Sequence, residues 1–159
     1  MQTLLPVAQK VGDALKRRGE TIAVAESSSG GLIAAALLSV AGASAYFVGG
    51  VVSYTRKSMS ELLNLGDEDF KQMRGLTEPT ALVMARSIRT RLAATWAIAE
   101  IGASGPTGSR YGDAAGTSAI AIVGATEHAT VLRTATADRV ANMEKFAQKA
   151  LEMLDQILA

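Results

Sequence analysis

Apolar residues along the first half of the chain follow two spacings, one typical of helices and the other of buried strands. Residues 4–15 are apolar at every third or fourth position, which predicts a helix that stops at Gly19. The unbroken run "TIAVA" from Thr21 predicts a buried strand. A second helix is expected from about Gly31 to Val40, and a second strand, "FVGGVVSY", ends at Tyr54.

The second half of the chain continues this mixture of elements. A short helix is expected around 58–63, followed by a longer helix with Thr77 as N-cap and Pro79 in its first turn. "WAIAEIG" predicts a third strand, and "TSAIAIVGA" with "TVLRTATA" predicts a hairpin around "TEHA". The last helix starts near Asp138 and carries one apolar stripe as far as Leu158.

These elements predict an α/β fold, a single layered domain over residues 1–159 with a mixed β-sheet of about five strands flanked by helices. The terminal hairpin makes the sheet mixed rather than purely parallel. The stripe of the last helix suits packing on the chain's own sheet, and it suits a homo-oligomer equally well.

Composition narrows the classes of function. The chain has 159 residues, 48% of them hydrophobic and 19% charged, which is typical of a globular protein. A net charge of +1 provides no footprint for nucleic acid. With no cysteine and one histidine, His128, expected in an exposed hairpin turn, we predict no metal site and no cofactor. No run predicts a membrane span and the N-terminus lacks a secretory signal, so we expect a cytoplasmic protein.

The strand-to-helix turn Glu26–Gly31 is the first candidate site. Free backbone N–H groups at a helix start favour an anion or a developing oxyanion. The alternative is that Ser28 or Ser29 only caps the helix, although one cap does not account for three serines. Glu26 and Glu100 both stand near the carboxyl ends of strands. If the strands are neighbours, the two carboxylates can share a proton or bind a cation; we favour two separate hydrogen-bonded carboxylates.

The glycine-rich loop "GASGPTGSRYGDAAG", residues 102–116, is the second candidate site. Its glycines permit close backbone approach to a ligand, and Arg110 or Tyr111 can clamp a phosphate or stack on a ring. The Gly-Lys-Ser/Thr ending of a Walker loop is absent. Near Tyr54, Lys57 can act as a base for a serine if burial lowers its pKa, but we favour a solvated charged turn.

Several of these stretches together resemble the CinA C-terminal domain family. "AESSSGG" at 25–31 is similar to the family's Ala-Glu-Ser-Cys-Thr-Gly-Gly, and "GASAYF" at 42–47 to its next block. "LTEPTALVMA", "GASGP" at 102–106 and Asp138-Arg139 resemble later family motifs, in order along nearly the whole chain.

The resemblance implies a nicotinamide-nucleotide amidohydrolase, which converts nicotinamide mononucleotide to nicotinic acid mononucleotide and ammonia without a metal. Ser27 matches the proposed nucleophile, and Ser44 and Tyr54 match helper positions; we place Glu26 with Ser27 and Tyr54 in the catalytic set. The substrate-binding residues are then expected to be Ser28, Ser29, Gly30, Ser44, Gly102, Gly105, Arg110, Tyr111 and Arg139.

The chain departs from the family pattern where a serine would be activated. The family usually has a lysine five residues after the strand-end tyrosine, and Met59 stands there. Ile101 and Met143 occupy two more positions that are usually polar. Losing a general base costs roughly 10²–10⁴ in rate. The alternative prediction is therefore a paralogue that binds a nucleotide or another phosphorylated small molecule without hydrolysing it.

Overall fold

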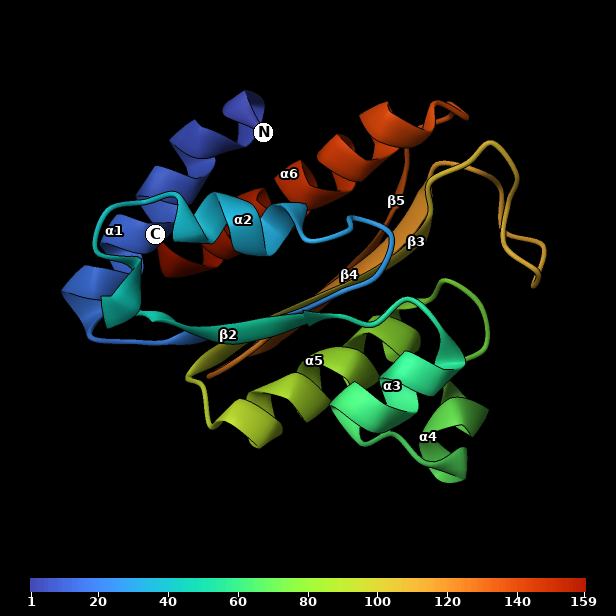
Figure 1. Cartoon of the computed structure of the whole chain (residues 1–159), viewed down its shortest axis with the longest axis horizontal. Helices are drawn as coiled ribbons and strands as arrows, with labels where there is room; N and C mark the ends of the chain where they lie inside the picture. Colours follow the sequence, from blue (N-terminus) through green and yellow to red (C-terminus); the bar gives the residue numbers. More distant parts are fainter.

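The computed structural model describes residues 1–159 and confirms the mixed α/β sheet (Figure 1). Its five strands stand in the order β2-β1-β3-β4-β5. Strands β1, β2 and β3 are parallel to one another, β4 is antiparallel to β3, and β5 is antiparallel to β4. Their bounds are β1 Ile22–Glu26, β2 Phe47–Val52, β3 Trp96–Ala103, β4 Thr117–Val123 and β5 Glu127–Arg133. The apolar strands β1 and β4 are buried throughout, as is most of β3, because helices cover both faces of the sheet.

Six α-helices form the outer layers. They are α1 Leu5–Arg18, α2 Leu32–Leu38, α3 Arg56–Leu63, α4 Asp67–Gln72, α5 Glu78–Leu92 and α6 Arg139–Leu158, with short 3₁₀ turns η1 Gln2–Leu4 and η2 Ala43–Ala45. In Figure 1, α1, α2 and α6 lie over one face of the sheet, and α3, α4 and α5 lie on the other. Alternate β3 residues feed the two cores: Ile98 packs with the first group and Ala97 with the second.

The secondary structure differs from the sequence-based prediction in two places: α4 was missed and His128 was misplaced. The six-residue α4 buries no side chain completely, so it has no apolar stripe to detect; its acidic first turn, residues 67–69, is the only start pattern. His128 lies in β5 and not in the hairpin turn, although it is exposed as expected. None of the helices is both long and apolar enough to cross a membrane.

Parallel strands place three segments at one edge of the sheet. The chain leaves β1, β2 and β3 at their carboxyl ends, so the serine turn, Tyr54 and the glycine-rich loop meet there.

Asn142 of α6 anchors the glycine-rich loop by donating to the carbonyls of Ser104 and Thr136, both at 2.8 Å. Gly105 has φ +112°, and a Cβ there would lie 2.4 Å from the carbonyl oxygen of Ala137, so only glycine fits.

Candidate functional site

Glu26, at the end of β1, caps the helix that follows the serine turn. Its fully buried carboxylate accepts the backbone N–H groups of Gly31 at 3.0 Å, Ile33 at 3.1 Å and Ala34 at 2.8 Å. The N-cap residue itself is Gly31 and provides no side-chain bond. The expectation that Ser28 or Ser29 caps α2 is therefore wrong. A carboxylate from the preceding strand does this work, and it suits the partial positive charge of a helix start.

Glu100 of β3 occupies the N–H groups on the other side of the turn. Its carboxylate accepts the backbone N–H groups of Ser27 at 3.2 Å and Ser29 at 2.8 Å. It also accepts the hydroxyls of Ser28 at 2.5 Å and Ser118 at 3.0 Å. We expected the N–H groups of this turn to be free for an anion, and the structure corrects this for most of them: carboxylates accept those of Ser27, Ser29 and Gly31.

The two buried glutamates meet across one hydroxyl. Ser29 Oγ lies 2.7 Å from Oε2 of Glu26 and 2.8 Å from Oε2 of Glu100. Our preference for two separate carboxylates is therefore wrong. Burial raises the pKa of the Glu26 carboxyl and the charge of Glu100 adds to this rise, while hydrogen bonds from Ser29, Ala34 and Ile33 oppose it. No group of three or more metal-ligating side chains is arranged to hold a metal ion.

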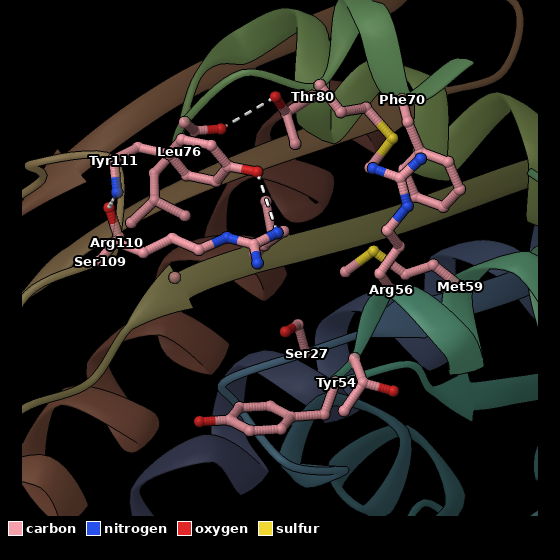
Figure 2. A pocket seen from close by; sticks show the side chains of 15 residues that line it. Ser27, Tyr54, Arg56, Met59, Phe70, Leu76, Thr80, Ser109, Arg110 and Tyr111 are labelled. Atoms are coloured by element: carbon pink, nitrogen blue, oxygen red, sulfur yellow. Dashed lines mark hydrogen bonds between the residues drawn. The ribbon is translucent and has the colours of Figure 1, made fainter. Parts of the chain in front are cut away.

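A cavity of about 450 Å³ opens beside this turn, with Ser27 in its wall (Figure 2). Ser27 is 4% exposed, and its hydroxyl has no hydrogen-bond partner in the protein. The wall is largely apolar toward α4 and α5. The lining residues are Ser27, Tyr54, Thr55, Arg56, Met59, Phe70, Met73, Gly75, Leu76, Thr80, Ile101, Gly102, Ser109, Arg110 and Tyr111.

Two arginines bring positive charge to this cavity. The guanidinium of Arg56 stacks 4.0 Å from the centre of the Phe70 ring and bonds Asp67 at 3.3 Å. Arg110 lies over the Tyr111 ring at 5.0 Å and donates to the Tyr111 hydroxyl at 3.0 Å. Apolar walls with a few cationic groups are suited to an aromatic ligand that carries a phosphate.

No amine or carboxylate forms a hydrogen bond with Ser27 Oγ; Glu100, the neighbouring carboxylate, accepts the Ser27 backbone N–H at 3.2 Å instead. Met59, at the position where the resemblance led us to expect a lysine, is buried and lines the cavity. The side chain of Lys57 is 86% exposed and lies 3.7 Å from Glu61. As expected for a charged turn, Lys57 faces solvent and does not replace the missing base.

The structure brings only some of the expected site residues to the cavity. Ser27, Tyr54, Gly102, Arg110 and Tyr111 line it. Ser28, Ser29 and Glu26 lie behind its wall, bound to one another or to Glu100. The remaining residues, Gly30, Ser44, Gly105 and Arg139, are outside the lining, and Ser44 is exposed on η2. The catalytic and binding roles of all of these residues stay predictions.

Arg139 has a bridging position near the cavity. It donates to the carbonyl of Gly105 at 2.7 Å and to the Tyr54 hydroxyl at 3.4 Å. It thus joins α6, the glycine-rich loop and the end of β2. Asp113 ties the loop to the opposite side by accepting the Leu76 N–H at 3.1 Å and the Ser109 hydroxyl at 2.6 Å.

Sequence reasoning missed several cavity residues. Phe70 lies in α4, which the apolar pattern did not reveal, and Met73 follows it. Leu76 precedes α5, and Thr80 lies in its first turn. Ser118 was missed at the start of an apolar strand, although the two polar residues that open "TSAIAIV" are a detectable exception in a buried strand.

A comparison with known protein families finds a match that covers almost the whole chain. The family described as "CinA C-terminal domain" matches residues 4–158. A CinA-like protein of Salinibacter ruber is 35% identical over 142 residues, which are 89% of this chain and 34% of that protein. A CinA-like protein of Trichormus variabilis is 40% identical over 102 residues, 64% of this chain and 24% of that protein. The chain thus spans about a third or less of these relatives.

Solved structures are similar over both full lengths. A competence-damaged protein (CinA) superfamily protein from Klebsiella pneumoniae superimposes with a TM-score of 0.91 and 29% identity, covering 98% of this chain and 97% of that one. The competence/damage inducible protein CihA from Agrobacterium tumefaciens has a TM-score of 0.89 and 29% identity, covering 98% and 94%.

Proposed function

The chain belongs to the CinA C-terminal domain family, and we propose that its cavity binds a nicotinamide nucleotide or a similar phosphorylated aromatic compound without hydrolysing it at an enzymatic rate. The observation that carries this proposal is the combination, in one cavity, of two arginines with a Ser27 hydroxyl that has no base beside it. The arginines bear on binding, and the missing base bears on catalysis.

Binding is supported by the size and chemistry of the cavity. Its volume of about 450 Å³ falls within the range of small-molecule sites. Phe70, Met73 and Leu76 provide apolar contact for a ring, and Arg56 and Arg110 provide charge for a phosphate. The aromatic rings that already hold both guanidinium groups restrict their motion, which lowers the entropy lost when a ligand binds.

Slow or absent hydrolysis is supported by the surroundings of Ser27. A serine hydroxyl is a poor nucleophile without a base, and Met59 offers none. The Ser27 and Ser29 N–H groups, which would stabilise an oxyanion, donate to Glu100 instead. Losing a base costs roughly 10²–10⁴ in rate, and losing one oxyanion donor costs roughly 10²–10³.

The second candidate is the amidohydrolase reaction itself, with nicotinamide mononucleotide as substrate and Ser27 as nucleophile. It is favoured by one observation: the Ser27 hydroxyl lines the cavity and is not engaged by another group. In this reaction Ser27 Oγ bonds to the carboxamide carbon, ammonia leaves with the proton of the hydroxyl, and water then cleaves the ester to the acid.

Calorimetric titration and an ammonia assay with nicotinamide mononucleotide separate the two candidates. We expect binding by the wild type, at least tenfold weaker binding by Arg110→Gln because a charge-assisted bond is lost, and unchanged binding by Arg133→Gln, which is exposed on β5. Ammonia release should equal that of Ser27→Ala. Binding with release that Ser27→Ala abolishes would favour the amidohydrolase, and no binding would overturn both.

Introducing an amine at position 59 tests whether Ser27 lacks only a base. Met59 lines the cavity, so Met59→Lys places an ammonium group at its wall. We expect a gain of ammonia release over the wild type if the missing base is the main defect. A variant that binds nucleotide and releases no ammonia would show that the Glu100 occupation of the turn is limiting.

A further inference from the structure

Glu26, Ser29 and Glu100 form a sealed polar cluster whose protonation state neither candidate function addresses. All three residues are 0% exposed. The cluster lies directly behind the cavity wall, because Gly102 lines the cavity while a Cβ on Gly102 would lie 3.0 Å from Glu100 Oε1 and 2.6 Å from Ser28 Oγ. A change of charge in the cluster therefore occurs directly next to Gly102, a residue of the cavity wall.

The hydrogen-bond count in this cluster does not balance with two ionised carboxylates. Ser29 Oγ contacts Oε2 of both glutamates, at 2.7 and 2.8 Å. A hydroxyl carries one proton and ionised carboxylates carry none. With both ionised, one proton must serve two negatively charged oxygens at these distances. One additional proton removes the conflict, since carboxyl, hydroxyl and carboxylate then form a chain of two full hydrogen bonds.

No charged side chain offsets this repulsion, and the backbone N–H groups at the start of α2 offset it only in part, since the pKa of Glu26 stays raised despite them. Neither glutamate takes part in an ion pair, and the neighbouring strands β1, β2, β3 and β4, the turn and α2 hold no other charged side chain. Helix α6 faces the turn and Gly102 with the uncharged residues Met143 and Phe146, which lie next to Gly30 and Gly102. Its Arg139 bonds Gly105 and Tyr54, its Glu144 bonds the N-terminus, and its Lys145 is exposed. Two like charges in such surroundings favour uptake of one proton.

We propose that Glu26, Ser29 and Glu100 hold one shared proton at neutral pH, and that this proton sets the position of Ser27. Glu100 is the positioning residue, because the carboxylate that contacts Ser29 Oγ also accepts the N–H groups of Ser27 and Ser29. When the proton leaves to solvent, two carboxylates repel across Ser29 Oγ, and the turn that carries Ser27 shifts. The inference concerns the free protein and does not depend on a ligand.

Infrared spectroscopy of the wild type tests the shared proton directly. A buried protonated carboxyl has a carbonyl stretch separate from that of ionised carboxylates. We expect this band at neutral pH in the wild type and its loss in Glu100→Gln. The amide introduced by Glu100→Gln can accept the two N–H groups through its oxygen and donate to the Ser28 and Ser118 hydroxyls, so Glu26 keeps the Ser29 hydroxyl to itself and ionises.

Amide NMR tests the link to Ser27. As pH rises in the wild type, the N–H shifts of Ser27 and Ala34, which report on Glu100 and Glu26, should titrate with one common midpoint. In Glu100→Gln the midpoint at Ala34 should move to lower pH, because the negative neighbour is gone. Glu127→Gln is the matched control: this carboxylate is ion-paired with Arg86 on the surface, and its loss should leave the band and midpoint unchanged.

Two results would overturn the proposal. The first is a wild type without the protonated-carboxyl band at neutral pH, which means that both glutamates are ionised. The second is a band and an Ala34 midpoint that persist unchanged in Glu100→Gln, which means that Glu26 holds a proton alone. A purely structural role for Glu100 changes stability but moves neither the band nor the midpoint.

Discussion

Replacing Glu26 with alanine should loosen the start of α2, because one side chain satisfies three backbone donors there. The N–H of Ile33 belongs to a fully buried residue, whereas Gly31 and Ala34 are half-buried. A buried donor left without a partner costs about 1–3 kcal/mol, and a donor that exchanges its partner for water loses about 0.5–1.5 kcal/mol. Removing the buried charge and its repulsion by Glu100 returns part of this sum.

The expected net loss is about 2–4 kcal/mol in the free energy of unfolding, a large share of the 5–15 kcal/mol typical of a domain. Urea denaturation measures it, and amide hydrogen exchange should localise it to Ile33 and Ala34. Glu127→Ala is the control. Its carboxylate bonds Arg86 on the surface, and its side chain is 41% exposed, so its loss should cost below about 1 kcal/mol.

The reasoning is refuted if Glu26→Ala costs no more than Glu127→Ala, or if exchange at Ile33 does not accelerate. In either case the desolvation cost of the carboxylate would cancel its hydrogen bonds, and α2 would be held by its apolar contacts alone. Those contacts are extensive, since Ile33, Ala36 and Leu37 are fully buried against α1, α6 and the sheet.

Three further outcomes are expected. The pKa of Glu26 in the native state is raised above the 4.5 of a free carboxyl, so the native state binds this proton more tightly than the unfolded state does. The stability that the proton contributes is therefore complete below pH 4.5 and is lost as the pH rises through the native pKa. Urea midpoints over a pH series should therefore fall less steeply in Glu26→Ala than in the wild type above pH 4.5, and parallel curves would contradict this. Gly102→Ala puts a Cβ 2.6 Å from Ser28 Oγ and 2.9 Å from Phe146, and this overpacking should lower the unfolding free energy by about 1–3 kcal/mol in urea; an unchanged midpoint would mean that the cluster is loosely packed. Asn142→Ala leaves the carbonyls of Ser104 and Thr136 without their donor and should cost about 2–3 kcal/mol in the same assay, with faster proteolysis of the glycine-rich loop; an intact, equally stable protein would show that water replaces the amide.

Elements with a strong apolar pattern were predicted well from the sequence. Helices α1, α5 and α6 each bury a continuous apolar stripe, and strands β1 and β4 are short apolar runs. Their buried residues can therefore be recognised from the local spacing of apolar positions. Helix α4 was missed because its contacts are partial and come from the cavity region. Its residues take their place from packing on α5, which local spacing does not encode.

The candidate site likewise has a part that the sequence predicts and a part that it does not. The serine turn, the glycine-rich loop and the strand ends were predictable, because parallel strands bring their carboxyl ends to one edge. The partners of the serines were not. The sequence suggested a serine cap and free N–H groups, whereas Glu26 and Glu100 take both roles through strand pairing of β1 with β3.

By itself, the sequence determined a mixed α/β domain, a family resemblance and a methionine, Met59, where that resemblance leads one to expect a lysine. Only the tertiary structure decided that Ser27 faces a cavity without a base, and that two glutamates 74 positions apart in the chain contact one serine hydroxyl (26 and 100). The physical reason is that periodicity reports which face of an element is buried, whereas hydrogen-bond partners depend on strand order and register. Those are set by the packing of the whole sheet.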